Sequence, residues 1–315
     1  MLPLVVILGP TATGKTKIAI DLALKIGGEI ISGDSMQVYR YMNIGTAKIK
    51  STETKGIPHH LLDIKDPHEL FSVADFQKLA REKIIEITKK GKIPFLVGGT
   101  GLYIQAVIDP YEFTEQENAL PYRRKIFSLA EKKGKIYVHQ LLRSVDPVSA
   151  EKIHPHDLKR VSRALEYYHL TGKPISENRK AKQKKSLYNL APIGLTLERS
   201  LLYQRIEQRV DQMMAEGFLE EVKSLLLKGY SPDLPAMQGL GYRQLVGYLQ
   251  GDYDLPEAVA LIKRETRHFA KRQLTWFRRD SRIKWFAVDR FEANYEQLLT
   301  EILFFIGRTL SFNVE

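Results

Sequence analysis

The chain has 315 residues, of which 43% are hydrophobic, and a formal net charge of +11. This length is enough for a large core and two domains. The absence of cysteine excludes disulfides, thiolate catalysis and cysteine-bound zinc. The sequence contains no apolar stretch of about 18 residues, the length of a membrane span, and leaves no room for a signal peptide before its first predicted strand. We therefore expect a cytoplasmic protein without a membrane partner.

The positive charge is concentrated in two segments. Residues 151–190 hold ten Lys and Arg against four Asp and Glu, and residues 263–284 hold nine against two. Together the two segments exceed the net charge of the chain, so the remainder is slightly acidic. Two basic zones on a nearly neutral body favour a polyanion as partner, most simply nucleic acid. Solvated helix faces are the alternative.

The first predicted elements are a strand, a glycine-rich loop and a helix. The apolar run Leu4–Leu8 predicts the strand, and Lys15–Lys25 has helical periodicity. The loop between them is a complete G-x-x-x-x-G-K-[ST] motif in the context that this motif requires: Gly9, Pro10, Thr11, Ala12, Thr13, Gly14, Lys15 and Thr16. Its backbone amides and the helix N-terminus can bind phosphate, Lys15 adds a point charge, and the Thr16 hydroxyl can coordinate Mg²⁺. The sequence therefore predicts a site for a di- or triphosphate.

Strands and helices alternate over the next hundred residues. Strands are predicted at Gly28–Ser32, at Ile93–Val97 and, as a third strand or an edge element, at His60–Ile64, and a helix is predicted over Ala74–Lys90. This alternation predicts a parallel sheet flanked by helices. Ligands of such sheets lie outside the carboxyl ends of the strands, so residues that follow strand ends are expected to converge on one crevice.

Two such residues besides the phosphate loop carry side chains that suit catalysis. Asp34 is either a general base or metal-bridging carboxylate, or the cap of a following helix. The strand that ends before Gly98 lacks the acid that many P-loop ATPases place there, which weakens an ATPase or kinase interpretation. Instead, Thr100 offers a hydroxyl within a glycine turn.

From about residue 113 the sequence changes from alternating strands and helices to charged, helical segments. Charged helical sequence ends in a basic run at 179–185, and a core strand is predicted at Ala191–Leu197. We expect a discontinuous P-loop core over 1–112 and 187–315, and a helical insertion domain over 113–186. The remainder is predicted as helix, including Leu201–Leu227 and Glu257–Arg279.

The C-terminal helices supply candidate cations. Arg205 and Arg209 lie one helical turn apart, and either can be a clamp on a leaving phosphate or a surface ion-pair residue. In the helix predicted over Glu257–Arg279, an apolar face is predicted from Ile262, Phe269, Ala270 and Trp276 or Phe277. The opposite face is cationic, and it is either solvated or a stripe that binds a phosphate backbone: Arg264, Arg267, Lys271 and Arg278. The eight histidines show no metal-binding spacing.

These segments, in this order, resemble the tRNA dimethylallyltransferase family, also called tRNA isopentenyltransferases. Nine segments carry the resemblance: Gly9–Thr16, Ser32–Tyr39, Gly45–Lys48, Pro58–Asp63, Val97–Tyr103, Ile153–Pro155, Arg160–Glu166, Gly241–Arg243 and Ala270–Phe277. One departure is His156, where the family usually has Asn.

The resemblance implies a P-loop NTPase-like α/β fold and a prenyl transfer reaction with Mg²⁺. The dimethylallyl group of dimethylallyl diphosphate would pass to the exocyclic N6 amine of the adenine just 3′ of the anticodon in tRNA. The phosphate loop would then hold a diphosphate leaving group rather than ATP. By carry-over, Asp34 accepts the amine proton, Thr100 holds a phosphate or the base, and Lys15, Arg209 and Thr16 with Mg²⁺ stabilise the diphosphate.

The resemblance also implies contacts with the anticodon stem-loop of tRNA. The residues that match are Asp34, Ser35, Met36, Gln37, Gly101, Arg123, Lys159, Arg160, Val161, Ser162, Arg163, Gly239, Leu240, Gly241, Tyr242, Arg243 and Gln244. A monomer is expected. Two alternatives are an adenylate isopentenyltransferase acting on free nucleotides, which would not need the basic insertion, and a nucleotide kinase, which should carry an acid near Gly98. A non-enzymatic RNA-binding module would not explain the complete phosphate loop.

Overall fold

The computed structural model of the protein describes residues 1–111, 120–180 and 186–311. The chain forms two compact units, one of residues 1–108 with 186–315 and an inserted one of residues 109–185. The sequence analysis places the insertion at 113–186. Of the basic run at 179–185, positions 181–185 lie outside the described residues.

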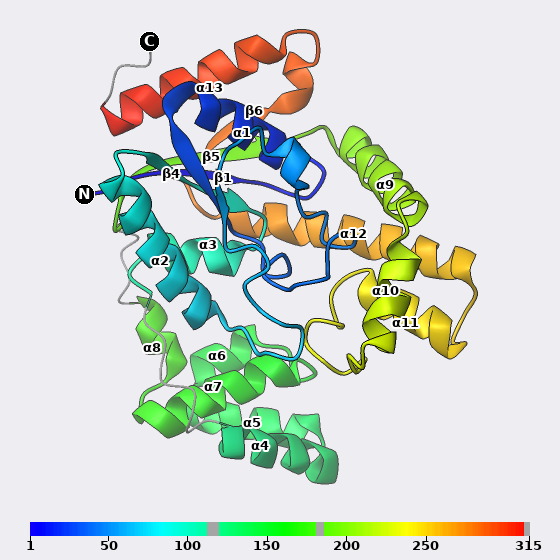
Figure 1. The fold of residues 1–315 in the computed structure, drawn as a ribbon. Coiled ribbons are helices and arrows are strands. Elements are labelled where there is room, and N and C mark those ends of the chain that lie inside the picture. The colour runs from blue at the N-terminus through cyan, green and yellow to red at the C-terminus, as the bar shows by residue number, and fades with distance from the viewer. Residues whose placement is uncertain (112–119, 181–185, 312–315) are drawn as a thin grey trace. The chain divides into compact units, whose positions relative to one another are not determined.

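The first unit is built on a six-stranded parallel sheet in the order β3-β2-β4-β1-β5-β6 (Figure 1). Its strands are β1 (Pro3–Leu8), β2 (Gly28–Ser32), β3 (His59–His60), β4 (Ile93–Gly98), β5 (Asn189–Thr196) and β6 (Lys284–Ala287). The central strand β1 pairs with β4 on one side and with β5 on the other. The predicted α/β fold, a parallel sheet flanked by helices, is confirmed.

Helices cover both faces of the sheet. α1 (Lys15–Ile26) and α13 (Tyr295–Leu310) pack on one face, and α2 (Val73–Lys89) and α3 (Gly101–Ile108) on the other. The side chains of strand β1 alternate between the two layers: Val5 and Ile7 pack in the first, and Leu4, Val6 and Leu8 pack in the second. Because both faces are covered, the strand reads as a continuous apolar run.

Two elements differ from the sequence prediction. The strand predicted at His60–Ile64 is only the two-residue edge strand β3, because Leu61 and Asp63 adopt positive φ angles of 63° and 53° that end it. The helix predicted over Leu201–Leu227 is two helices, α9 (Arg199–Ala215) and α10 (Phe218–Leu227). Gly217, with a φ of 96°, separates them.

The helices after β5 form a cluster of their own within the first unit. α10, α11 (Tyr242–Gln250) and α12 (Leu255–Phe277) share a core with residues 38–42. On α12 the buried side chains are Ala258, Ile262, Ala270, Gln273 and Phe277. The predicted apolar face was wrong for Phe269, which remains 36% exposed. Short 3₁₀ helices cover Ser51–Glu53 and Val288–Phe291.

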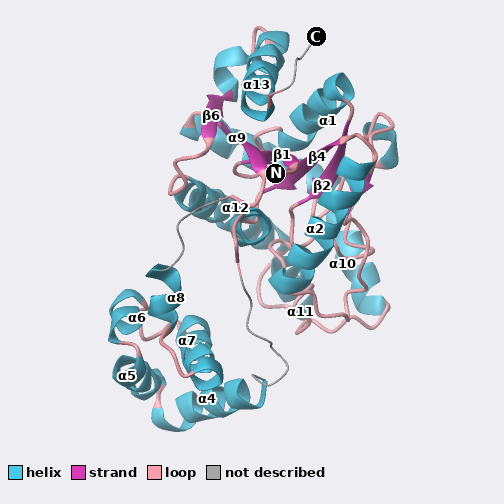
Figure 2. Cartoon of the chain, turned by 90° about the vertical axis from the view of Figure 1, so that its left-hand side faces the viewer, coloured by secondary structure: helices cyan, strands magenta, loops and turns pink. Residues whose placement is uncertain are grey.

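In the described part of the inserted unit, short loops join five helices, and no strand is present there (Figure 2). Its helices are α4 (Leu120–Lys133), α5 (Lys135–Val145), α6 (Pro147–Lys152), α7 (Leu158–Thr171) and α8 (Ile175–Lys180). They enclose a small core that includes Val138, Leu142 and Leu165. In neither unit do the described residues include a helix long and apolar enough to cross a membrane.

Candidate active site

The phosphate loop joins β1 to α1 and curls its backbone through left-handed conformations. Ala12 and Gly14 have φ angles of 64° and 80°, and Gly14 is the N-cap of α1. Left-handed residues alternating with ordinary ones turn successive amides toward a common centre, which suits an anion. The N-terminus of α1 adds partial positive charge at the same place.

Lys15 folds back over this loop. Its ammonium donates a hydrogen bond of 2.6 Å to the carbonyl of Pro10, which also accepts 2.9 Å from the Thr13 hydroxyl. Desolvation, and then the neighbouring charge of Arg209, lower the pKa of Lys15 to about 7, while Asp34 acts in the opposite direction. Burial also lowers the pKa of Arg209, and the charge of Asp34 opposes that shift. These three charged groups are therefore electrostatic neighbours, as a site for a diphosphate and a base requires.

The loops after β2 and β4 are joined at the carboxyl edge of the sheet. Gly33 donates its amide to the Val97 carbonyl at 2.7 Å, and a Cβ at Gly98 would lie 2.4 Å from the Gly33 carbonyl oxygen. Asp34 accepts the Met36 amide at 2.8 Å, so its carboxylate closes a turn instead of capping a helix. Residues 33–50 contain no helix, so the capping interpretation of Asp34 is wrong.

Thr100 connects the β4 loop to the β2 loop. Its hydroxyl accepts the Ser35 amide at 3.3 Å and lies 3.5 Å from the Ser35 hydroxyl. The hydroxyl is thereby held one residue from the Asp34 backbone. The structure thus brings together residues that are 65 positions apart in the sequence.

A cavity of about 240 Å³ lies over this edge of the sheet. Its charged side chains are Asp34 and Arg209, and its hydroxyl-bearing residues include Thr11, Ser35, Thr46, Thr100 and Thr266. The rest of its wall is largely apolar: Met36, Ile206, Val210, Met213, Phe218, Leu240, Tyr242, Ile262 and Phe269. An apolar wall beside a base and a cation suits a substrate with a hydrocarbon part and a charged part.

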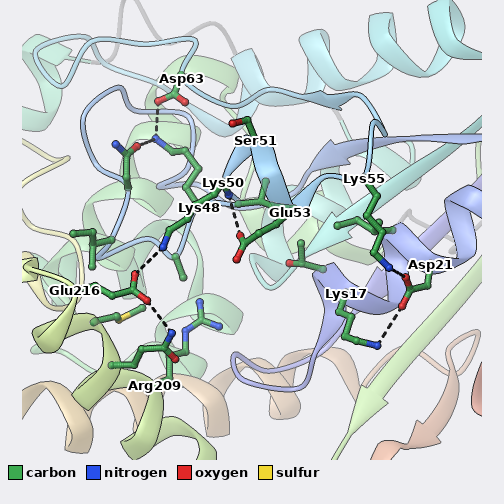
Figure 3. A pocket seen from close by; sticks show the side chains of 18 residues that line it. Lys17, Asp21, Lys48, Lys50, Ser51, Glu53, Lys55, Asp63, Arg209 and Glu216 are labelled. Atoms are coloured by element: carbon green, nitrogen blue, oxygen red, sulfur yellow. Dashed lines mark hydrogen bonds and ion pairs between the residues drawn. The ribbon is translucent and has the colours of Figure 1, made fainter.

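A second, larger cavity of about 850 Å³ shares Arg209 and Met213 with the first and includes Thr16 in its wall (Figure 3). Ion pairs cross its rim: Lys50 with Glu216 at 3.3 Å, Lys55 with Asp21 at 2.6 Å, and Lys48 with Asp63 at 2.6 Å. Arg209 therefore lines both cavities, with Thr11 of the phosphate loop on the wall of the smaller one and Thr16 on the wall of the larger one.

Comparison with known proteins identifies the family. A family model described as IPP transferase matches residues 37–280. The chain belongs to the IPP transferase family. The curated tRNA dimethylallyltransferase of Carboxydothermus hydrogenoformans is 55% identical over 301 residues, covering 95% of this chain and 96% of that protein. That of Heliobacterium modesticaldum is 52% identical over 310 residues, covering 98% and 96%.

Solved structures agree with this assignment. The full-length tRNA isopentenylpyrophosphate transferase of Bacillus halodurans is 46% identical, with a TM-score of 0.75 and coverage of 99% of this chain and 97% of that one. A eukaryotic dimethylallyltransferase acting on tRNA is 30% identical, with a TM-score of 0.80 and coverage of 95% and 77%. Both matches extend over nearly all of this chain.

Most of the expected RNA-contacting residues of the core unit line the smaller cavity, whereas Gln37, Gly101, Arg243 and Gln244 do not. The wall of this cavity includes Ser35, Met36, and Gly239 through Tyr242. Gln37 is engaged internally, since its amide accepts the Ser32 hydroxyl and donates to the carbonyls of residues 46 and 47. Gly101 lies against the Trp276 ring, Gln244 is buried, and Arg243 is exposed beside Glu265 at 3.8 Å.

The expected RNA-contacting residues of the insertion are divided between its surface and its core. Lys159 and Arg160 are exposed at the start of α7, whereas the side chains of Val161 and Ser162 are buried. Arg123 forms a two-point ion pair with the fully buried Glu166, which Arg163 also approaches at 3.4 Å. These two arginines therefore stabilise the inserted unit, whatever else they bind.

Sequence reasoning missed two residues that hold the site in place. The Glu221 carboxylate accepts the Tyr242 hydroxyl at 2.7 Å and the amides of residues 43, 44 and 45 at 2.8, 2.8 and 3.2 Å. Gln273 bonds to both the phosphate loop and the β4 loop. A surface-helix pattern gives no signal for either role. Of the two arginines proposed as clamps, Arg205 pairs with Glu292 at 2.7 Å, and Arg209 lines both cavities.

Proposed function

We propose that this chain transfers the dimethylallyl group of dimethylallyl diphosphate to the N6 amine of an adenine in tRNA, just 3′ of the anticodon. One observation carries the proposal: a single cavity has Arg209, phosphate-loop residue Thr11, Asp34 and Thr100 on its wall, and most of its remaining side chains are apolar. A leaving diphosphate, a base and a hydrocarbon binding surface are the three requirements of the reaction.

The bond changes assign a task to each group. The bond between the allylic carbon and the diphosphate oxygen breaks as a bond from N6 to that carbon forms, and N6 then loses a proton. Asp34 accepts that proton. Lys15, Arg209 and the loop amides stabilise the negative charge that develops on the departing diphosphate. Thr100 positions the loop that carries Asp34, through its bond to the Ser35 amide.

The site suits Mg²⁺ bound together with the diphosphate. The Thr16 hydroxyl is exposed on the wall of the larger cavity, and Mg²⁺ typically takes one or two protein oxygens together with phosphate oxygens and water. Among the described residues no group of three His, Asp or Glu could hold a metal without substrate. Bound there, the ion would neutralise diphosphate charge.

The acceptor is proposed to be tRNA because exposed cations suit a phosphate backbone. Lys159 and Arg160 are exposed on the insertion, and Lys271 and Arg272 on α12. A stacked adenine cannot reach a half-buried carboxylate, so the target base must leave its stack at a cost of a few kcal/mol. We infer that the enzyme acts as a monomer on the anticodon stem-loop, in the cytoplasm where tRNA is modified.

Label transfer tests the proposal. Radiolabelled dimethylallyl diphosphate and Mg²⁺ are incubated with unmodified tRNA, with an anticodon stem-loop, or with AMP. The proposal predicts label in both RNAs. Label in AMP alone would make the chain a nucleotide prenyltransferase, and ATP turnover without label transfer would make it a kinase. The Asp34→Asn variant, purified in the same way, is the control for contaminating activity, because the substitution should remove nearly all of the label transfer.

A further inference from the structure

Gln273 forms a bridge between two loops of the active site. It lies on α12, is 6% exposed, and bonds at both ends of its side-chain amide. Its Oε1 accepts the backbone amide of Thr11 in the phosphate loop at 3.0 Å. Its Nε2 donates to the carbonyl of Gly99 at 2.9 Å. These contacts span 262 and 174 positions of sequence.

The chemistry of the two partners requires a group that both accepts and donates, as the side-chain amide of Gln273 does. A backbone N–H can only donate and a carbonyl can only accept, so the bridging group must accept at one end and donate at the other. A Cβ at Gly99 would lie 2.2 Å from Gln273 Nε2, so the glycine makes room for the amide. Because the backbone amide of Thr11 already donates to Gln273, it is not available to a ligand. An anion would therefore be bound by the later amides of the phosphate loop.

The bridge continues toward the base. Gly99 immediately precedes Thr100, whose hydroxyl accepts the Ser35 amide next to Asp34. One buried side chain therefore fixes the phosphate loop relative to the loop that supports the base. Both loops follow neighbouring strands, β1 and β4, whose pairing ends at Leu8 and Gly98, and Gln273 links them beyond the end of that pairing.

We propose that Gln273 is a positioning residue of the transfer reaction, an inference that rests on the proposed function. It holds the diphosphate-binding amides at a fixed distance from Thr100 and Asp34. Loss of the bridge should lower kcat and weaken diphosphate binding, while tRNA affinity stays the same. A residue that merely stabilises the fold would lower the melting temperature without this pattern.

Two variants test the bridge. Gln273→Met keeps the size of the side chain and loses both bonds. We expect its kcat/KM for dimethylallyl diphosphate to fall by about ten- to hundredfold, since each lost bond leaves a buried polar group unsatisfied. The inhibition constant of inorganic pyrophosphate should rise, and the KM for tRNA should change by less than about twofold. Gln77→Met is the matched control, because Gln77 also donates to a buried carbonyl, that of Ala106 at 2.7 Å, without touching the site.

The pH dependence of the Gln273→Glu variant is a second readout, which a purely structural role of Gln273 would not change. An ionised carboxylate can accept from Thr11 but cannot donate to Gly99, whereas the protonated acid can do both. The activity of this variant relative to wild type should therefore recover as the pH falls. Each pH is compared with wild type, so other titrating groups cancel.

The outcomes separate the two proposals. If wild type transfers no label, the proposed function fails. If wild type is active and Gln273→Met equals Gln77→Met in kcat and in pyrophosphate inhibition, the positioning role is overturned. A ratio of Gln273→Glu to wild type that is flat with pH would also overturn it, and this test remains available if the Met variant does not fold.

Discussion

The charge of Lys15 should make diphosphate binding depend on pH near neutrality. Burial and the proximity of Arg209 lower the pKa of this lysine from 10.5 to about 7. Only the ammonium form can bind a diphosphate as a cation, so binding should weaken as the pH rises through this value. A lysine with its ordinary pKa would show no change over the same range.

The magnitude follows from the pKa of about 7. The ammonium fraction is about 0.9 at pH 6 and about 0.1 at pH 8, so affinity should fall by about tenfold between them. The bound diphosphate raises the pKa of Lys15, because an opposite charge favours the charged form. Binding should therefore take up about 0.9 proton at pH 8 and about 0.1 at pH 6.

Calorimetry measures both quantities. Dimethylallyl diphosphate is titrated into the enzyme without acceptor RNA, in two buffers that differ in ionisation enthalpy. In the Lys15→Met variant, the pH dependence of binding comes from groups other than Lys15, including the phosphate of the substrate. The difference in pH dependence between wild type and this variant is therefore due to Lys15. A wild-type to Lys15→Met affinity ratio that is equal at pH 6 and pH 8 would refute the reasoning.

The neighbours of Lys15 provide a second check of the same electrostatics. Replacing Arg209 with Met removes a charge that lowers the Lys15 pKa, so the pH midpoint of binding should rise. Replacing Asp34 with Asn removes a charge that raises this pKa, so the midpoint should fall. Shifts in the same direction would contradict the assigned proximity of the three groups.

Three further outcomes are expected from substitutions elsewhere. Asp34→Asn should lower kcat by about 10²- to 10⁴-fold, measured by label transfer, while tRNA affinity in a filter-binding assay stays within about twofold. Glu221→Ala should lower the free energy of unfolding by about 3 kcal/mol in urea titrations, since three backbone amides and a tyrosine hydroxyl lose their acceptor; a change below about 1 kcal/mol would contradict this anchor. Lys159→Gln combined with Arg160→Gln should reduce the slope of log affinity for tRNA against log salt by about 1 to 2, and an unchanged slope would exclude an RNA contact there.

The sheet, and which loops meet at its carboxyl edge, could be predicted from the sequence because both depend on local patterns. Each central strand is an apolar run that ends in glycine or a polar residue, and parallel strands all end at one edge. That rule alone places the phosphate loop, Asp34 and Thr100 together. It says nothing of distances, and it does not identify Arg209, which comes from a helix 109 positions beyond Thr100.

Other parts of the site depend on contacts that leave no local pattern. The apolar wall combines side chains such as Met36, Ile206 and Phe218 from three separate segments, each of which reads as ordinary core. Phe269 fits the periodicity of a buried helix face, yet it lines the cavity because α12 packs only part of that face. Gln273 and Glu221 read as surface polar residues, since burial by distant segments is not visible in a helical repeat.

The close contact between Gly33 and Gly98 explains why no acid follows β4 at position 98, and the same contact lies next to Asp34, the proposed base. In P-loop ATPases an acid near that strand end holds the metal. Here any side chain at position 98 would meet the Gly33 backbone, with a Cβ 2.4 Å from its carbonyl oxygen and 2.7 Å from its Cα. The chain could carry an acid at position 98 only by pushing away the loop that presents Asp34. In the proposed reaction, the carboxylate that takes the proton of the acceptor amine instead comes from the loop after β2, beside an apolar wall. In the same proposal, the phosphate loop binds the departing diphosphate.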